Sequence, residues 1–179
     1  MINIITQTLE FYLKYLKEPS LADIKDVNPE LLTTRGSCFV TLYKNGEIRW
    51  SAGNVKEVEA NLALELIKNT IAAATSDARF EKLKLDEVWS IKIRIDVIEE
   101  RKVLAEWKLK EVDPVKHGVI AIKKEYDKLA VILPNISPKL LTGSDFAAFL
   151  SAKLSGDFEE KNYIVYEITT KTESNVGIK

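Results

Sequence analysis

The dipeptide Asn45-Gly46 separates two runs rich in β-branched, aromatic and apolar residues, and it constrains the fold more than any other feature. Both positions of a two-residue type I′ turn require a positive φ, which Asn and Gly accept most readily. We therefore predict a hairpin whose pairing runs without interruption from Lys44 opposite Glu47 to Val40 opposite Ser51. Strand alternation then predicts two faces. One face contains Cys38, Val40, Leu42, Arg49, Ser51 and Gly53, and the other, expected to be the core, contains Phe39, Thr41, Tyr43, Ile48 and Trp50.

The rest of the chain supplies strands in pairs, with amphipathic helices between them. Apolar residues at helical spacing predict helices over 2–17, from a cap at Asn54 to about Thr75, and after Ser144 or Asp145. Alternating or apolar runs predict strands over 88–98, 119–122, 129–133 and 163–169, followed by a frayed tail from Thr172. This order predicts the α+β fold class, with a mainly antiparallel sheet and flanking helices. The charged segment 99–116 is the expected subdomain boundary.

Charge and rare residues exclude several classes of protein. Lys and Arg number 26 against 27 Asp and Glu, so the net charge of −1 argues against nucleic acid or a membrane surface as the main partner. Cys38 and His117 are the only residues of their types, which excludes an intrachain disulfide, a zinc finger and a Cys-x-x-Cys redox centre, and leaves open only a carboxylate site for a hard metal. We expect neither a metal nor a cofactor. No apolar run is long enough to span a bilayer, and we expect a cytoplasmic protein.

Three residues are candidates for catalysis. Cys38 and His117 form the only available Cys–His pair, but a lone Cys on a strand is more often a small buried hydrophobic residue. Ser51 lacks the Gly-x-Ser-x-Gly surroundings of a hydrolase nucleophile. His117 precedes a glycine before a strand, where it can transfer a proton or, in the simpler interpretation, bond to the backbone of a turn.

Arginines supply the candidates for anion binding. Arg35 and Arg49 flank the hairpin, and each can hold a carboxylate or phosphate through its two-pronged guanidinium. Asp77 and Arg79 follow the end of a predicted helix, where a local ion pair is the simpler interpretation than a substrate clamp.

Five segments, taken in order, resemble the AMMECR domain family, whose prokaryotic members are called AmmeMemoRadiSam system protein A. Residues 47–53 resemble its Leu-Arg-Gly-Cys-Ile-Gly signature, and residues 76–80 resemble its Asp-Pro-Arg-Phe step. Segments 85–93, 116–118 and 132–134 follow in the family's order. The chain keeps Arg49, Gly53, Asp77, Arg79, Phe80, His117 and Gly118 of the family pattern. It departs from the signature with Trp50 in place of Gly, Ser51 in place of Cys and Ala52 in place of Ile.

The resemblance implies a single domain over 1–179, with a larger antiparallel-sheet lobe, a smaller lobe and a cleft between them. Segments around 20–35 and 99–116 are candidates for the smaller lobe. The family has no established reaction, and its prokaryotic members are associated with Memo-like and radical-SAM proteins. If a thiol role survives here, we expect Cys38 to take it over from the position of Ser51.

We expect an AMMECR-like binding or accessory protein with a polar cleft for a small anionic ligand, lined by Arg49, Ser51, Gly53, Asp77, Arg79 and His117. One alternative is an enzyme of a radical-SAM or Memo-associated pathway, with His117 as general acid or base. Another is a protein-interaction module that uses the region around Trp50 as an apolar anchor. The first two interpretations require the charged residues to converge on one pocket.

Overall fold

The computed structural model describes residues 1–176 and divides the chain into two compact units. Unit 1 consists of Met1–Val97 together with the residues from Thr172 on, and unit 2 consists of Ile98–Lys171. The segments 20–35 and 99–116 therefore belong to different units. Within residues 1–176, no helix has the length and apolar character needed to cross a membrane.

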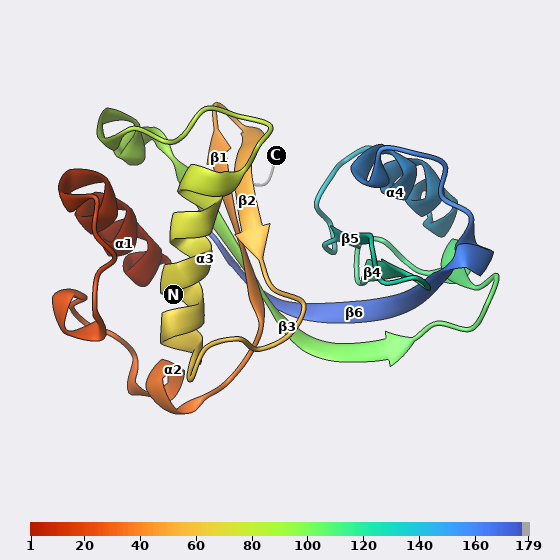
Figure 1. The fold of residues 1–179 in the computed structure, drawn as a ribbon, viewed down its shortest axis with the longest axis horizontal. Helices are drawn as coiled ribbons and strands as arrows, with labels where there is room; N and C mark the ends of the chain where they lie inside the picture. Colours follow the sequence, from red (N-terminus) through yellow and green to blue (C-terminus); the bar gives the residue numbers. More distant parts are fainter. Residues whose placement is uncertain (177–179) are drawn as a thin grey trace. The chain divides into compact units, whose positions relative to one another are not determined.

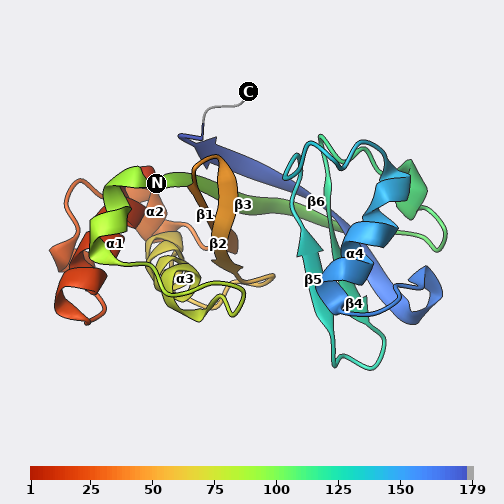
Figure 2. The same cartoon turned by 90° about the horizontal axis from the view of Figure 1, so that it is seen from above.

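Unit 1 packs helices against one face of a small antiparallel sheet (Figures 1 and 2). Its core combines apolar side chains of the helices with those of the sheet, including Ile5, Leu66 and Ile95. The helices α1 and α3 contact each other, and α3 also contacts both strands of the hairpin. The elements of the unit are α1 (Ile2–Tyr15), α2 (Pro29–Thr33), β1 (Cys38–Lys44), β2 (Glu47–Gly53), α3 (Leu62–Ser76) and the first half of β3 (Lys92–Val103).

The turn of the hairpin is as predicted, but its register changes after two pairs. Asn45 and Gly46 have φ of 55° and 82°, as a type I′ turn requires. A β-bulge follows, because Tyr43 pairs with Ile48 and Leu42 pairs with Trp50. Arg49 is thus the extra residue of the bulged strand, and the pairing expected for Leu42 with Arg49 is wrong.

The bulge also reverses the predicted faces of β2. Trp50 now lies beside Leu42 and Val40 in the core of unit 1. Ser51 pairs with Thr41 on the opposite face of the sheet. Trp50 was predicted on the face of Phe39 and Thr41, but it lies on the face of Val40 and Leu42. Ser51 was predicted to share a face with Cys38, and it does not.

Helix α3 begins later than predicted. Its N-cap is Asn61, whose side chain accepts the backbone N–H of Leu64 at 3.0 Å. Asn54, the expected cap, instead donates its side-chain amide to Glu65 at 2.6 Å. Glu65 is buried in α3 and also accepts the backbone N–H groups of Val58 and Glu59. A buried carboxylate needs such donors, and this requirement fixes the loop before the helix.

The third strand differs from its prediction at both its start and its polar face. Residues Leu85–Ser90 form a 3-10 helix, and β3 starts at Lys92, so Trp89 lies outside the sheet and is 82% exposed. The apolar residues Ile93 and Ile95 are buried as predicted. Asp96, on the alternate face, is also buried, where it holds Arg94 through two bonds of 2.8 Å.

Unit 2 has its own core under a short helix (Figure 1). The predicted hairpin of β4 (Gly118–Lys123) and β5 (Leu129–Ile132) is confirmed, and α4 (Phe146–Leu154) contacts β5. Strand β6 (Tyr163–Ser174) extends further than predicted, so the frayed tail does not include Thr172. Residues 177–179 of the predicted tail lie outside the described residues.

The strands form one six-stranded sheet in the order β2-β1-β3-β6-β4-β5. Consecutive strands such as β1 and β2, or β4 and β5, pair antiparallel as hairpins. Strands β3 and β6 contribute residues to both units. An antiparallel sheet with flanking helices confirms the α+β prediction.

Candidate functional site

Arg49 occupies the bulge of β2, and the bulge determines where its side chain lies. In an uninterrupted register Arg49 would lie opposite Leu42, which is fully buried. The extra residue removes Arg49 from that pairing and leaves its side chain exposed at the edge strand of the sheet. β-Bulges commonly redirect one side chain in this way near functional sites.

The guanidinium of Arg49 lies against two aromatic rings. Its central carbon is 4.8 Å from the centre of the Phe80 ring and 5.5 Å from that of Trp50. The two rings meet edge to face at 6.5 Å. Cation–π contacts of this kind hold a guanidinium in place without using its N–H donors. Within residues 1–176, Arg49 forms no hydrogen bond or ion pair, so these donors face solvent.

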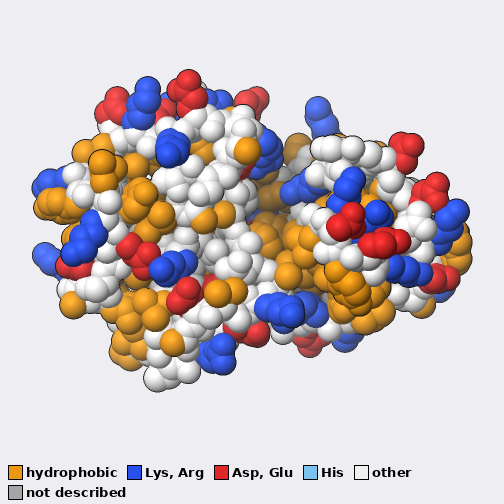
Figure 3. Space-filling model, viewed as in Figure 1, with side chains coloured by type: hydrophobic (Ala, Val, Ile, Leu, Met, Phe, Trp, Pro, Cys, Tyr) orange, Lys and Arg blue, Asp and Glu red, His pale blue; other side chains and the backbone are white. Residues whose placement is uncertain are grey.

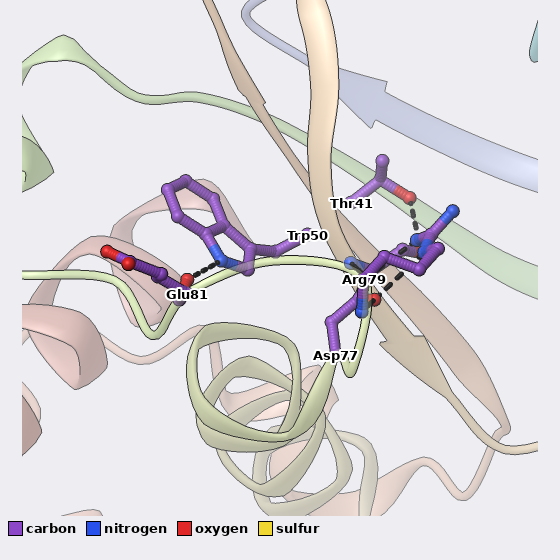
Figure 4. Close-up of polar contacts among 6 residues, drawn as sticks. Thr41, Trp50, Asp77, Arg79 and Glu81 are labelled. Atoms are coloured by element: carbon purple, nitrogen blue, oxygen red, sulfur yellow. Dashed lines mark hydrogen bonds and ion pairs between the residues drawn. The ribbon is translucent and has the colours of Figure 1, made fainter.

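Trp50 is a buried support for this arrangement. Only 2% of its surface is exposed, and its indole N–H donates to the carbonyl oxygen of Glu81 at 2.7 Å (Figure 4). The indole thereby fixes the segment that carries Phe80. Because Trp50 is buried, it does not form the exposed apolar anchor expected for an interaction module.

Asp77 joins three parts of the site (Figure 4). Its carboxylate accepts the guanidinium of Arg79 through bonds of 2.8 and 2.6 Å and the backbone N–H of Arg79 at 3.2 Å. It also accepts the backbone N–H of Ser51 at 3.0 Å. Arg79 in turn places its guanidinium 5.3 Å from the centre of the Phe80 ring. The local ion pair preferred for these residues is therefore present.

The environment of Asp77 keeps it ionised. Burial raises the pKa of its carboxyl, but hydrogen bonds from the Arg79 side chain and from the N–H groups of Arg79 and Ser51 outweigh burial. The net result is a pKa below the ordinary value of 3.8. At neutral pH, Asp77 therefore neutralises Arg79.

Within residues 1–176, neither nucleophile candidate of unit 1 has its side chain hydrogen-bonded to a base. The hydroxyl of Ser51 bonds the hydroxyl of Thr41 at 3.1 Å, and a hydroxyl is not a general base. Cys38 is fully buried, and burial raises the pKa of its thiol to about 12. Its sulfur contacts the side-chain amide of Asn69 in the core, on the other face of the sheet from Ser51. Cys38 is therefore not placed to substitute for a thiol at position 51.

Gly53 is explained by packing. A Cβ atom at this position would overlap the ring of Phe39, its partner on β1, and would lie 2.5 Å from the carbonyl oxygen of Cys38. The glycine thus lets an aromatic ring cover the end of β2.

His117 belongs to unit 2. Its backbone N–H donates to the carbonyl of Asp113 at 2.9 Å, which is the turn interaction considered in the sequence. Its Nδ1 lies 3.1 Å from a carboxylate oxygen of Glu167, off the direction needed for a hydrogen bond. Glu167 also lines a hollow of about 390 Å³, together with Leu104, Ala105, Lys108, Glu111 and Val112.

The structure therefore brings Arg49, Ser51, Asp77 and Arg79 together in unit 1, with Gly53 further along the same strand. Convergence of His117 with these residues stays a prediction. The sequence interpretation missed two contributors, Phe80 and Thr41. Phe80 was visible as part of the family-like step at 76–80, whereas no local pattern indicates the partner of Ser51.

Charged side chains elsewhere on unit 1 do not form a field of one sign on the face in view. Figure 3 shows basic and acidic side chains interspersed over that face. Several charged side chains of unit 1 form ion pairs, such as Lys68 with Glu18 at 2.8 Å. Within residues 1–176, no group of three or more His, Cys, Asp or Glu side chains is arranged to hold a metal ion.

Known proteins match most of this chain in sequence. The family model AMMECR1 matches residues 2–166. A protein of Thermotoga maritima is 35% identical over 133 residues, covering 73% of this chain and 72% of the relative. A protein of Clostridium acetobutylicum is 33% identical over 118 residues, which cover 65% of this chain and 24% of that protein. The match thus spans about a quarter of the clostridial relative.

A solved structure supports the fold independently. The crystal structure of an uncharacterised protein from Pyrococcus horikoshii has a TM-score of 0.81 to this chain, at 23% identity. The match covers 94% of this chain and 86% of the other. With the family model spanning nearly the whole sequence, the chain belongs to the AMMECR1 family.

Proposed function

We propose that this AMMECR1-family protein is a binding or accessory protein that recognises a small anionic ligand through Arg49. The observation that carries the proposal is the state of its guanidinium, which is exposed, held against Phe80 and Trp50, and free of any acidic partner within residues 1–176. A fixed guanidinium with free donors is suited to a carboxylate or phosphate.

The neighbours of Arg49 support binding more than nucleophilic catalysis. Asp77 and Arg79 satisfy each other, and Ser51 bonds to a hydroxyl. Each is therefore engaged in holding the edge of the sheet. An enzyme of a Memo-like or radical-SAM pathway stays the alternative, with His117 and its neighbour Glu167 as the acid–base candidates.

We also propose that the ligand or the chain is presented to a second protein in the cytoplasm, a Memo-like or radical-SAM protein being the expected partner. The clostridial relative supports a joint role, because the matched region is only 24% of that protein and must work beside other sequence. A single cysteine fits a reducing compartment.

Thermal unfolding of the full chain in a panel of sodium salts tests the proposal. Acetate, benzoate, phosphate and phenyl phosphate serve as probes, at constant ionic strength. We expect at least one anion to raise the midpoint of wild-type protein, because a ligand of the native state stabilises it by mass action. Arg49→Gln should abolish the rise, whereas Arg35→Gln, at an exposed arginine of the same unit, should retain it. An equal rise in both variants would contradict the role of Arg49.

A further inference from the structure

We propose that the anion recognised by Arg49 is a single carboxylate, and that phosphate groups are disfavoured. This inference rests on the proposed function and specifies the ligand class of the same site. Three features of unit 1 carry it: the local charge, the use of the backbone donors and the shape of the free guanidinium.

The local charge fits a monoanion. Arg49 and Arg79 each carry one positive charge and lie against the same ring of Phe80. Asp77 contributes one negative charge, because hydrogen bonds from Arg79 and Ser51 lower its pKa and outweigh the burial of its side chain. The group therefore has a net charge of +1, which one carboxylate neutralises. A phosphate dianion would leave an excess negative charge next to Asp77.

The backbone donors that a phosphate requires are already in use. Phosphate sites generally combine basic side chains with several backbone N–H groups. Here the N–H groups of Ser51 and Arg79 both donate to the carboxylate of Asp77. Asp77 thus leaves neither of these two N–H groups free for a phosphate oxygen.

The guanidinium of Arg49, whose donors remain free within residues 1–176, has a geometry that matches a carboxylate. Arg49 presents a planar fork, which matches two carboxylate oxygens in one plane. The ring contacts fix the guanidinium, so less side-chain freedom is lost on binding. Arg79 has two of its guanidinium nitrogens bound to Asp77 and is the weaker partner.

Titration with three matched aryl anions tests the inference. Benzoate and benzenesulfonate are monoanions of different shape, and phenyl phosphate is mainly a dianion at pH 7.5. Binding to the full ¹⁵N-labelled chain is followed by NMR, through the indole N–H of Trp50 and nearby backbone amides. We expect benzoate to bind about tenfold more tightly than phenyl phosphate and more tightly than benzenesulfonate. Arg49→Lys, which keeps the charge but not the fork, should weaken benzoate binding.

The outcomes separate this inference from the proposed function. Phenyl phosphate binding as tightly as benzoate, and lost in Arg49→Gln, would overturn the carboxylate assignment while the anion site stands. Equal affinities for benzoate and benzenesulfonate would overturn it as well, because shape would then have no effect. Binding of no anion, or binding unchanged in Arg49→Gln, would overturn both.

Asp77→Asn should shift the preference in the opposite direction, from benzoate toward phenyl phosphate. Removing the negative charge raises the net charge of the group to +2, and phenyl phosphate should then gain affinity relative to benzoate. No change in that ratio would contradict the charge argument.

A peptide with a free C-terminus, compared with its amidated form, distinguishes the source of the carboxylate. The amidated peptide should not bind, because it lacks the carboxylate. If the free-acid peptide binds more tightly than benzoate, the carboxylate of a protein is supported as the ligand; if it binds more weakly, the carboxylate of a free metabolite is supported.

Discussion

The carboxylate of Asp77 accepts the backbone N–H of Ser51 at 3.0 Å, across 26 positions of the chain. Strand β2 is one of the two edge strands of the sheet, so this bond occupies a donor on its open edge. Edge donors that are not covered invite pairing with another chain. Asp77 therefore has two roles, since it protects the edge and neutralises Arg79 beside the anion site.

Loss of the Asp77 carboxylate should destabilise unit 1. We expect Asp77→Ala to lower the free energy of unfolding by about 2 kcal/mol, because it leaves the N–H of Ser51 and the guanidinium of Arg79 without their acceptor. Chemical denaturation measures the change. Asp86→Ala, at an exposed aspartate of the same unit, is the matched control and should have little effect. Equal effects of the two substitutions would show that Asp77 is an ordinary surface residue.

The contribution of Asp77 should depend on pH in a defined direction. Its pKa is lower in the folded protein than the ordinary value of 3.8, so its stabilising effect is complete above that value. The effect is lost as the pH falls through the folded pKa. We expect the stability difference between wild type and Asp77→Asn to be constant from about pH 7 to about pH 5 and to shrink below about pH 4. A difference that grows on acidification would contradict the assigned shift.

Gly53 should not tolerate a side chain. A methyl group there meets the ring of Phe39 and the carbonyl oxygen of Cys38, so Gly53→Ala should cost about 2 kcal/mol through overpacking. Gly36→Ala is the matched control, because its Cβ would meet only side-chain atoms, at 3.6 Å and beyond. Thermal unfolding of the two variants checks the expectation. Comparable midpoints would mean that the end of β2 can shift away from Phe39.

Cys38 should be inert in the native protein. With a pKa of about 12, roughly one thiol in 10⁴ is ionised at pH 8, and the sulfur is buried. An aromatic disulfide reagent should label Cys38 only after denaturation. Ser51→Cys, made in a Cys38→Ala background, should react faster, because position 51 is partly exposed. Rapid labelling of the wild-type native protein would restore Cys38 as a nucleophile candidate.

The sequence predicted the turn, the three longer helices and the two hairpins, because these depend on local pattern. It did not predict the bulge at Arg49. Ile48 and Trp50 alternate with Arg49 and Ser51, so the pattern places Trp50 on the face of Ile48. The structure instead buries the indole of Trp50 beside Leu42, where its N–H donates to the carbonyl oxygen of Glu81. Glu81 is 31 positions from Trp50, so no local pattern indicates this hydrogen bond.

The start of α3 was missed for a similar reason. Asn54 and Asn61 are both good N-caps, and the sequence alone favoured the earlier one. The structure uses Asn61, because buried Glu65 requires the side chain of Asn54 as a donor.

The candidate site was predicted in part: the family-like segments identified Arg49, Asp77 and Arg79. The sequence also favoured the ion pair of Asp77 with Arg79, which the structure confirms. Only the structure shows that Arg49 lies against two aromatic rings and has no acidic partner within residues 1–176.

The side-chain Nε–H resonance of Arg49 reports on both the ring contacts and the binding of an anion. In the free protein, the rings of Phe80 and Trp50 should displace this resonance from the random-coil position, and Phe80→Leu should reduce the displacement. On titration with benzoate, the resonance should move in a saturable way, while that of Arg35 stays in place. Saturable movement of the Arg49 resonance alone is expected if Arg49 binds the carboxylate. A resonance at the random-coil position that ignores benzoate would contradict it.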